Sequence, residues 1–276
     1  MKTRILAAGA YLVTGLVVFV VFSHMRPLLP ERYDLVGRIA LAGVLLAAAL
    51  LLRKSKRLSD HWRPAYAFFV AVVAMGIDLY VPSREWLLAL FYLENLSLAG
   101  IALDKLESTF VLVSVILILT KAAGLPVGSL YLRKGQFRKS LTIGLIAFAI
   151  AAFGSYFMAQ LFGAVNLSSE RIVPWILLFI LGNSLNEELL FRGQFLEGMA
   201  KTLGPLWANL VLILPFVLHH TGVEYTNDAL MFLAYLIPLA FFWARIMQKT
   251  DTLWGSVLFH AGTDVTVILV LFSQLA

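Results

Sequence analysis

A pair of adjacent glutamates in the C-terminal half of the chain has the residue types and spacing of a hydrolytic site. Glu187 and Glu188 follow a run of mostly apolar residues, and Arg192 comes shortly after them. On a helix, Glu188 and Arg192 can form an ion pair, whereas Glu187 is rotated by about 100° onto another face. One carboxylate can therefore be structural while the other is free to act. The alternative is an ordinary ion pair at a helix end, with both acids solvated.

Two histidines at the end of another apolar segment form a second group. His219 and His220 close the segment 205–220. We expect this segment to form a helical hairpin with segment 172–200. Glu187 and His220 then lie about sixteen residues on either side of the turn, so that at a rise of about 1.5 Å per residue they reach nearly the same depth. The spacing therefore predicts that a carboxylate and an imidazole meet.

A histidine and an aspartate on the last apolar segment form the third group. His260 and Asp264 stand one helical turn apart, and the small residues Ala261 and Gly262 between them permit close approach of a neighbouring helix. A carboxylate in this position can fix the tautomer of the imidazole or share a water with it. Each group alone is equally typical of a hydrogen-bonded core residue, but three such groups on three apolar segments favour a common site.

The composition places these groups in a membrane protein. Hydrophobic residues make up 61% of the chain and charged residues 14%, against roughly 45–50% and about 25% in soluble domains. Runs of about 17–25 apolar residues have the length that a membrane helix needs. We therefore expect an all-α, polytopic transmembrane helical bundle with about eight to nine membrane helices. The apolar segments run approximately over residues 5–22, 35–52, 64–81, 108–120, 140–162, 172–200, 205–220, 229–247 and 253–273.

The distribution of basic residues predicts how the bundle is oriented. The loops 53–63 and 133–139 are rich in Lys and Arg, so both should face the cytoplasm. Segments 64–81 and 108–120 are two crossings, which return the chain to the same side only if the segment 86–106 does not span. We expect 86–106 to be re-entrant or interfacial, and the N-terminus to be cytoplasmic. The net charge of +6 is explained by these loops, so no nucleic-acid partner is expected.

Taken in order, the three groups resemble a known family. They read as the motifs EExxxR from Glu187 to Arg192, FxxxH from Phe216 to His220 and HxxxD from His260 to Asp264. This set is similar to that of the CAAX protease and bacteriocin-processing (Abi) family of intramembrane endopeptidases, which includes the CAAX prenyl proteases. The resemblance covers roughly residues 172–270. We accordingly divide one continuous membrane domain into N-terminal transmembrane helices and basic loops, 1–139, and a catalytic core, 140–276.

The resemblance also implies a role for each residue. Glu187 would work with His220 on a water, while His260 and Asp264 stabilise the oxyanion; amide hydrolysis needs both a base and donors for developing negative charge. Asp264 stands where the eukaryotic branch has Asn, so it must be protonated to donate or must act through His260. The supporting residues would be Glu188, Arg192, Phe216 and His219, of which His219 is a possible substitute for His220.

The expected chemistry needs no cofactor. The chain has no cysteine, which excludes a cysteine nucleophile and thiolate metal ligands. It contains no HExxH motif, so we expect a metal-independent glutamate mechanism. The alternative is a zinc site formed by His220, His260 and Glu187.

Three function classes remain open from the sequence. The first is an endopeptidase that cleaves a membrane-associated peptide, whether lipidated, prenylated or leader-bearing, in the plasma membrane of a prokaryote. The second is a non-catalytic scaffold or immunity-type protein of the same fold. The third is a transporter that uses Glu187 and the histidines as a proton relay. The expected partners are membrane lipids and the peptide substrate, and nothing indicates an oligomeric state.

Overall fold

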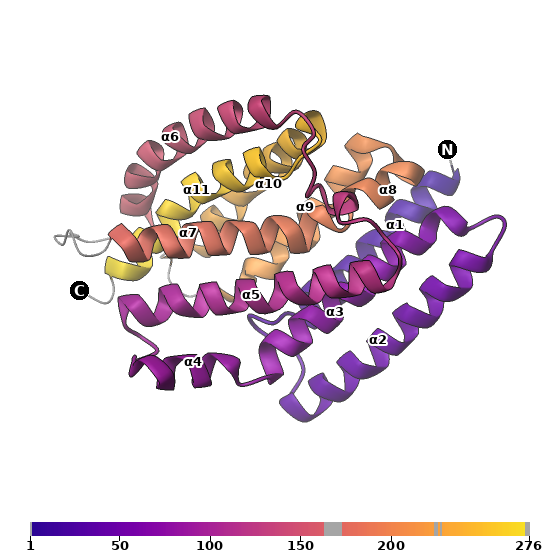
Figure 1. Ribbon diagram of the computed structural model, residues 1–276, viewed down its shortest axis with the longest axis horizontal. Coiled ribbons are helices and arrows are strands. Elements are labelled where there is room, and N and C mark those ends of the chain that lie inside the picture. Colours follow the sequence, from indigo (N-terminus) through magenta and orange to yellow (C-terminus); the bar gives the residue numbers. More distant parts are fainter. Residues whose placement is uncertain (1, 163–172, 224–225, 227, 274–276) are drawn as a thin grey trace.

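All regular secondary structure among the described residues of the computed structural model is helical (Figure 1). The structure describes residues 2–162, 173–223, 226 and 228–273. The α-helices are α1 (Lys2–Leu16), α2 (Glu31–Lys54), α3 (Trp62–Tyr80), α4 (Ser83–Phe91), α5 (Leu98–Ala122), α6 (Phe137–Leu161), α7 (Val173–Glu188), α8 (Leu196–Leu203), α9 (Pro205–His219), α10 (Ala229–Thr250) and α11 (Trp254–Ser273). The expected all-α fold is confirmed.

Six of the described helical segments are long and apolar enough to cross a membrane. They are Thr3–Val21, Glu31–Lys54, Ser59–Tyr80, Phe137–Leu161, Ala229–Thr250 and Trp254–Ser273. Helices α7 and α9 have 16 and 15 residues, fewer than the roughly 20 that a membrane-spanning helix needs. The polytopic helical bundle is thus confirmed, whereas the total of about eight to nine membrane helices stays a prediction.

The segment 86–106 divides between two helices. Its first part lies in α4, whose 9 residues extend only about 14 Å and cannot cross a bilayer core of roughly 30 Å. Its second part forms the first turns of α5, which begins ten residues before the predicted segment 108–120. Ser97 caps this helix by accepting a hydrogen bond from the backbone of Gly100 at 3.0 Å. The charged residues in these turns interrupt the apolar pattern, so that pattern does not predict where α5 begins.

Helix α11 lies at the centre of the bundle. It packs against both α6 and α7, and 67% of its apolar stretch is buried, compared with 11% for α6. A Cβ atom at Gly262 would lie 2.7 Å from the carbonyl oxygen of Phe148 on α6. The small residue is therefore needed for the close helix approach that the sequence predicts. Figure 1 shows α7 running between α5 and α11, and both contacts are present.

The predicted continuous helix 172–200 is interrupted. Helix α7 ends at Glu188, a π-helical turn covers Leu189–Gly193, and α8 begins at Leu196; residue 172 lies outside the described residues. The turn between the hairpin arms is at Gly204, whose φ is 83°. Helix α9 packs against α8, and to a similar extent against α10 and α1. A π-helical turn changes the direction of the chain and is frequent at functional sites.

The N-terminal helices pack directly on the C-terminal ones. Helix α1 contacts α9, and α5 contacts α7. The division into parts 1–139 and 140–276 remains a prediction, but the helices that position the three motifs are drawn from both parts.

Candidate functional site

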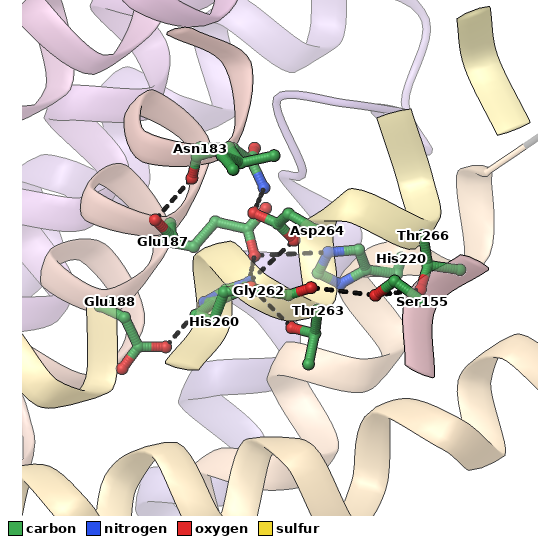
Figure 2. Close-up of polar contacts among 12 residues, drawn as sticks. Ser155, Asn183, Glu187, Glu188, His220, His260, Gly262, Thr263, Asp264 and Thr266 are labelled. Atoms are coloured by element: carbon green, nitrogen blue, oxygen red, sulfur yellow. Dashed lines mark hydrogen bonds and ion pairs between the residues drawn. The ribbon is translucent and has the colours of Figure 1, made fainter. Parts of the chain in front are cut away.

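The carboxylate of Glu187 faces two imidazoles. Its Oε2 atom lies 3.6 Å from Nε2 of His220 and 3.6 Å from Nε2 of His260 (Figure 2). The same oxygen is buried and has no hydrogen-bond partner among the described residues. At 3.6 Å the two contacts are longer than direct hydrogen bonds. Two imidazoles, from the end of α9 and from α11, therefore converge on one carboxylate oxygen of α7.

His220 is oriented by the backbone one turn before it. Its Nδ1 atom lies 2.9 Å from the carbonyl oxygen of Phe216, and because a carbonyl oxygen only accepts, Nδ1 must donate. In the neutral ring, Nε2 then carries the lone pair and faces Glu187. In the FxxxH motif, the backbone carbonyl of Phe216 therefore sets the tautomer of His220. The phenyl ring of Phe216 also lies beneath the guanidinium of Arg192, at 4.3 Å.

His260 is held on several sides. Its Nδ1 atom donates to Oε1 of Glu188 at 2.9 Å, and its Nε2 atom lies 3.4 Å from Oδ1 of Asp264. The indole of Trp243 stacks on the imidazole with ring centres 3.7 Å apart and planes 9° from parallel. These contacts fix the ring so that Nε2 points toward Glu187.

Glu188 is the hub of a buried network. The predicted ion pair with Arg192 is present, with Nη1 and Oε1 2.7 Å apart, and the two side chains are 3% and 0% exposed. Ser256 donates to the other carboxylate oxygen. The alternative in which both acids are solvated is therefore wrong. Beyond bracing its helix, Glu188 connects the first motif to His260 of the third.

Asp264 is fixed by a residue that the motifs do not include. The amide of Asn183 donates to Oδ2 of Asp264 at 3.1 Å, as Figure 2 shows. Asn183 stands one turn before Glu187, so its polarity within an apolar helix was a usable signal. The polarity of Ser256 within α11 was a similar but weaker signal. Trp243 gave no signal, because only tertiary packing brings α10 against the site.

The structure does not bring His219 to Glu187. Its Nδ1 atom lies 2.8 Å from the carbonyl oxygen of Phe19 and 3.1 Å from Oγ of Ser23. These contacts turn the ring toward α1 and its π-helical extension Val17–Val21. The remaining predicted residues lie together, and His219 supports the packing around them.

The converging groups line a cavity of about 280 Å³. Asn183, Glu187, His220, His260 and Asp264 form one part of its wall. Another part is apolar, with Leu96, Ile101, Phe179, Phe216, Phe232, Leu236, Val267 and Leu271. A third part carries the polar and charged residues Arg84, Asn95, Asp104 and Lys105. A mainly apolar cavity with a few convergent polar groups is typical of a ligand site.

A metal ion has no evident set of ligands in the part of the chain that the structure describes. No three His, Asp or Glu side chains there form a group that could hold one. Chelation tests the alternative in which His220, His260 and Glu187 bind zinc.

Comparison with known families supports the resemblance. Residues 169–266 match the model of the type II CAAX prenyl endopeptidase Rce1-like family, and this range contains all three motifs. No curated protein and no solved structure matches the chain. The geometry and the match agree with the family that the motifs predict. Over residues 169–266, the chain is similar to the type II CAAX prenyl endopeptidases, which supports the family that the motifs predict.

Proposed function

We propose that Glu187 and His220 activate a water molecule that attacks the peptide carbonyl of a membrane-associated substrate. The observation that carries this proposal is the buried Oε2 atom of Glu187, which faces both imidazole Nε2 atoms at 3.6 Å and has no hydrogen-bond partner among the described residues. Separations of this size suit a bridging water. A carboxylate and an imidazole that share one water are suited to remove its proton.

The neighbouring residues would stabilise the tetrahedral intermediate. With Nδ1 donating to Glu188, an imidazolium at His260 presents its second N–H toward the space beside Glu187, where the oxyanion forms. Asp264 lies beside the same nitrogen, with its Oδ1 atom 3.4 Å from Nε2 of His260. It would therefore act through His260, which accounts for an aspartate at a position where the family also has asparagine. The proton taken from water would pass to the leaving amine.

The apolar lining of the cavity favours a membrane-associated substrate. This apolar wall, which includes Phe232, Leu236 and Val267, lies in the same cavity as Glu187. A lipidated, prenylated or leader-bearing peptide could pack its apolar part on this wall while its backbone reaches the carboxylate. The name of the matched family refers to prenylated CAAX substrates, and a prenylated peptide is accordingly the first substrate to test.

The protein would lie in the plasma membrane of a prokaryote with its basic loops in the cytoplasm. Arg63 and Arg133, from the two basic regions, both pair with Glu197, at 3.1 Å each. The two regions therefore lie at the same end of the bundle, as the positive-inside rule requires. The hydroxyl of Tyr11 on α1 hydrogen-bonds to Nδ1 of His61 at 2.6 Å, which favours a cytoplasmic N-terminus.

The proposal can be tested with purified protein in lipid vesicles. The substrate is a farnesylated peptide that ends in a CAAX sequence and carries a fluorophore and a quencher. The Glu187→Gln variant keeps the shape of the side chain and removes the base, so cleavage should fall by roughly 10²–10⁴-fold. Glu94→Gln, at an exposed glutamate, is the matched control and should cleave normally. Undiminished cleavage by Glu187→Gln would overturn the proposal.

A further inference from the structure

The cavity that contains Glu187 reaches the surface of the protein at one end of the bundle. Among its wall residues, Met25, Asn95 and Leu96 are exposed, and the others are half-buried or buried. Met25 lies in the connection that precedes α2, and Asn95 and Leu96 lie in the connection between α4 and α5. We call these three residues the mouth of the cavity. A polar molecule that comes from water therefore reaches Glu187 from this end.

A helix of membrane-spanning length separates each part of the mouth from a basic loop. Helix α2, with 24 residues, runs from the connection that holds Met25 to the basic loop 53–63. Helix α5, with 25 residues, runs from the connection that holds Asn95 and Leu96 toward the basic loop 133–139. At a rise of about 1.5 Å per residue, the two helices are about 36 and 38 Å long, more than the roughly 30 Å of a bilayer core. The mouth and the basic loops therefore lie at opposite ends, and Figure 1 shows α4 at the left and the N-terminus at the right.

The distribution of Lys and Arg favours a mouth outside the cytoplasm. The loops 53–63 and 133–139 contain five and four such residues. The connections 23–30 and 81–97, which hold the mouth, contain one each. Because connections rich in Lys and Arg stay in the cytoplasm, the mouth faces the opposite side of the membrane.

A buried network separates the reaction centre from the basic end. Glu188 and Trp243 contact His260, and Arg192 pairs with Glu188 and lies 5.0 Å from the ring of Trp243. The side chains of Glu188, Arg192 and Trp243 are only 0%, 3% and 1% exposed. Beyond Arg192 the chain continues to Glu197, which pairs with both basic regions. These buried side chains close the reaction centre toward the cytoplasmic end.

A second, polar cavity adjoins the mouth. Its volume is about 400 Å³, and it shares Met25, Arg84, Asp104 and Lys105 with the cavity that contains Glu187. Charged side chains are tolerated inside a membrane protein when they pair with one another, as Arg84 and Asp104 do at 2.8 Å, or when they line a water-filled space. The wall of the second cavity also contains Asp78, Glu85, Glu107 and Ser108. This polar wall can accommodate water and the backbone of a peptide beside the mouth.

We propose that the peptide substrate enters through the mouth from outside the cytoplasm, so that the protein cleaves peptides presented at the extracytoplasmic face of the membrane. This inference rests on the proposed peptidase function and on the orientation of the basic loops. The apolar part of the peptide packs on the wall that includes Phe232 and Leu236, while its polar part stays at the mouth. The substrate class is a lipidated or leader-bearing peptide whose cleavage site lies outside the cytoplasm.

Sealed membrane vesicles of two orientations test the side of entry. The probe is the farnesylated, fluorescence-quenched CAAX peptide with sulfonated dyes, which prevent its polar part from crossing the bilayer. Right-side-out vesicles should cleave the probe, whereas inside-out vesicles should cleave it no faster than vesicles with Glu187→Gln until detergent opens them. Cleavage by sealed inside-out vesicles, or its absence from right-side-out vesicles, would overturn the inference.

Obstruction of the mouth tests the route. Because the chain has no cysteine, Leu96→Cys introduces a single thiol. Its modification with a bulky polyethylene glycol maleimide should abolish most of the cleavage that the same variant shows before modification. Tyr92→Cys is the matched control, because Tyr92 is exposed in the same connection and is not part of the cavity wall. Equal cleavage by the two modified variants would mean that the substrate does not pass the mouth.

Failure of this inference can be told apart from failure of the proposed function. Glu187→Cys places a thiol at the reaction centre, and a small, charged, impermeant thiol reagent then reports which side reaches it without any need for cleavage. Labelling from outside intact cells supports the inference, whereas labelling only in inside-out vesicles, or from neither side, overturns it. Cleavage by detergent-solubilised protein that does not depend on Glu187 overturns the proposed function instead.

Discussion

The carboxylate of Glu188 accepts a hydrogen bond from Nδ1 of His260 at 2.9 Å. The same Oε1 atom forms the ion pair with Arg192. The second glutamate of the doublet thereby orients the imidazole whose opposite nitrogen faces the first glutamate. Glu188 therefore links Glu187, its neighbour at the end of α7, to His260 on α11.

Replacing Glu188 by glutamine should impair both folding and cleavage. The variant leaves the buried guanidinium of Arg192 without a counter-ion, which costs about 3–5 kcal/mol. It also weakens the hydrogen bond that orients His260, so kcat should fall in the protein that remains folded. Thermal unfolding and the kcat of the folded fraction measure the two effects. A variant with wild-type stability and kcat would refute the role of this network.

The two adjacent histidines should respond differently to substitution. His220→Gln removes the Nε2 atom that faces Glu187 and should lower kcat/KM by roughly 10²–10⁴-fold. His219→Gln removes the hydrogen bonds to Phe19 and Ser23 and the ring contacts with His24, Phe191 and His220, but no contact with Glu187. It should therefore retain kcat within about threefold while lowering thermal stability by about 1–3 kcal/mol. The paired kinetic comparison is its own control. Equal loss of kcat in both variants would mean that His219 also reaches the site.

Removal of divalent cations should leave cleavage unchanged. The mechanism proposed for Glu187, His220 and His260 assigns every proton transfer to side chains, so it requires no Lewis acid. Cleavage is measured after prolonged chelation and again after addition of zinc. Loss of activity that zinc restores would favour the zinc alternative with these same three residues as ligands.

Cysteine labelling should locate the basic loops. Because the chain has no cysteine, Lys56→Cys, Lys134→Cys and Tyr92→Cys each introduce a single reactive site, and all three positions are exposed. An impermeant maleimide added to intact cells should label Tyr92→Cys and spare both lysine positions until the cells are opened. Labelling of Lys56→Cys and Lys134→Cys from opposite sides would contradict the proposed orientation.

Local spacing in the sequence predicts part of the site. Four-residue separation on a helix predicts the Glu188–Arg192 pair, which is present. Equal distance from the hairpin turn predicts that Glu187 and His220 meet, and their side chains lie 3.6 Å apart. Both relationships are present although the π-helical turn Leu189–Gly193 lies between Glu187 and the hairpin turn and contains Arg192. The catalytic roles of the residues stay predictions.

Contacts that depend on tertiary packing could not be predicted in this way. The stacking of Trp243 on His260 depends on where α10 crosses α11. The start of α5 was missed because its first turns carry Asp104 and Lys105, which interrupt the apolar pattern. A charged helical turn can lie within a membrane protein when it lines a cavity, and this is where Lys105 is found.

The central claim is that Glu187 and His220 act together on one water, and a double-mutant cycle tests it most directly. The kcat/KM for the farnesylated peptide is measured for Glu187→Gln, His220→Gln and the double variant. If the two residues act as a unit, each single variant should lose roughly 10²–10⁴-fold and the double variant should be no slower than the worse single one. Near wild-type cleavage in either single variant, or losses that multiply in the double variant, would contradict the account.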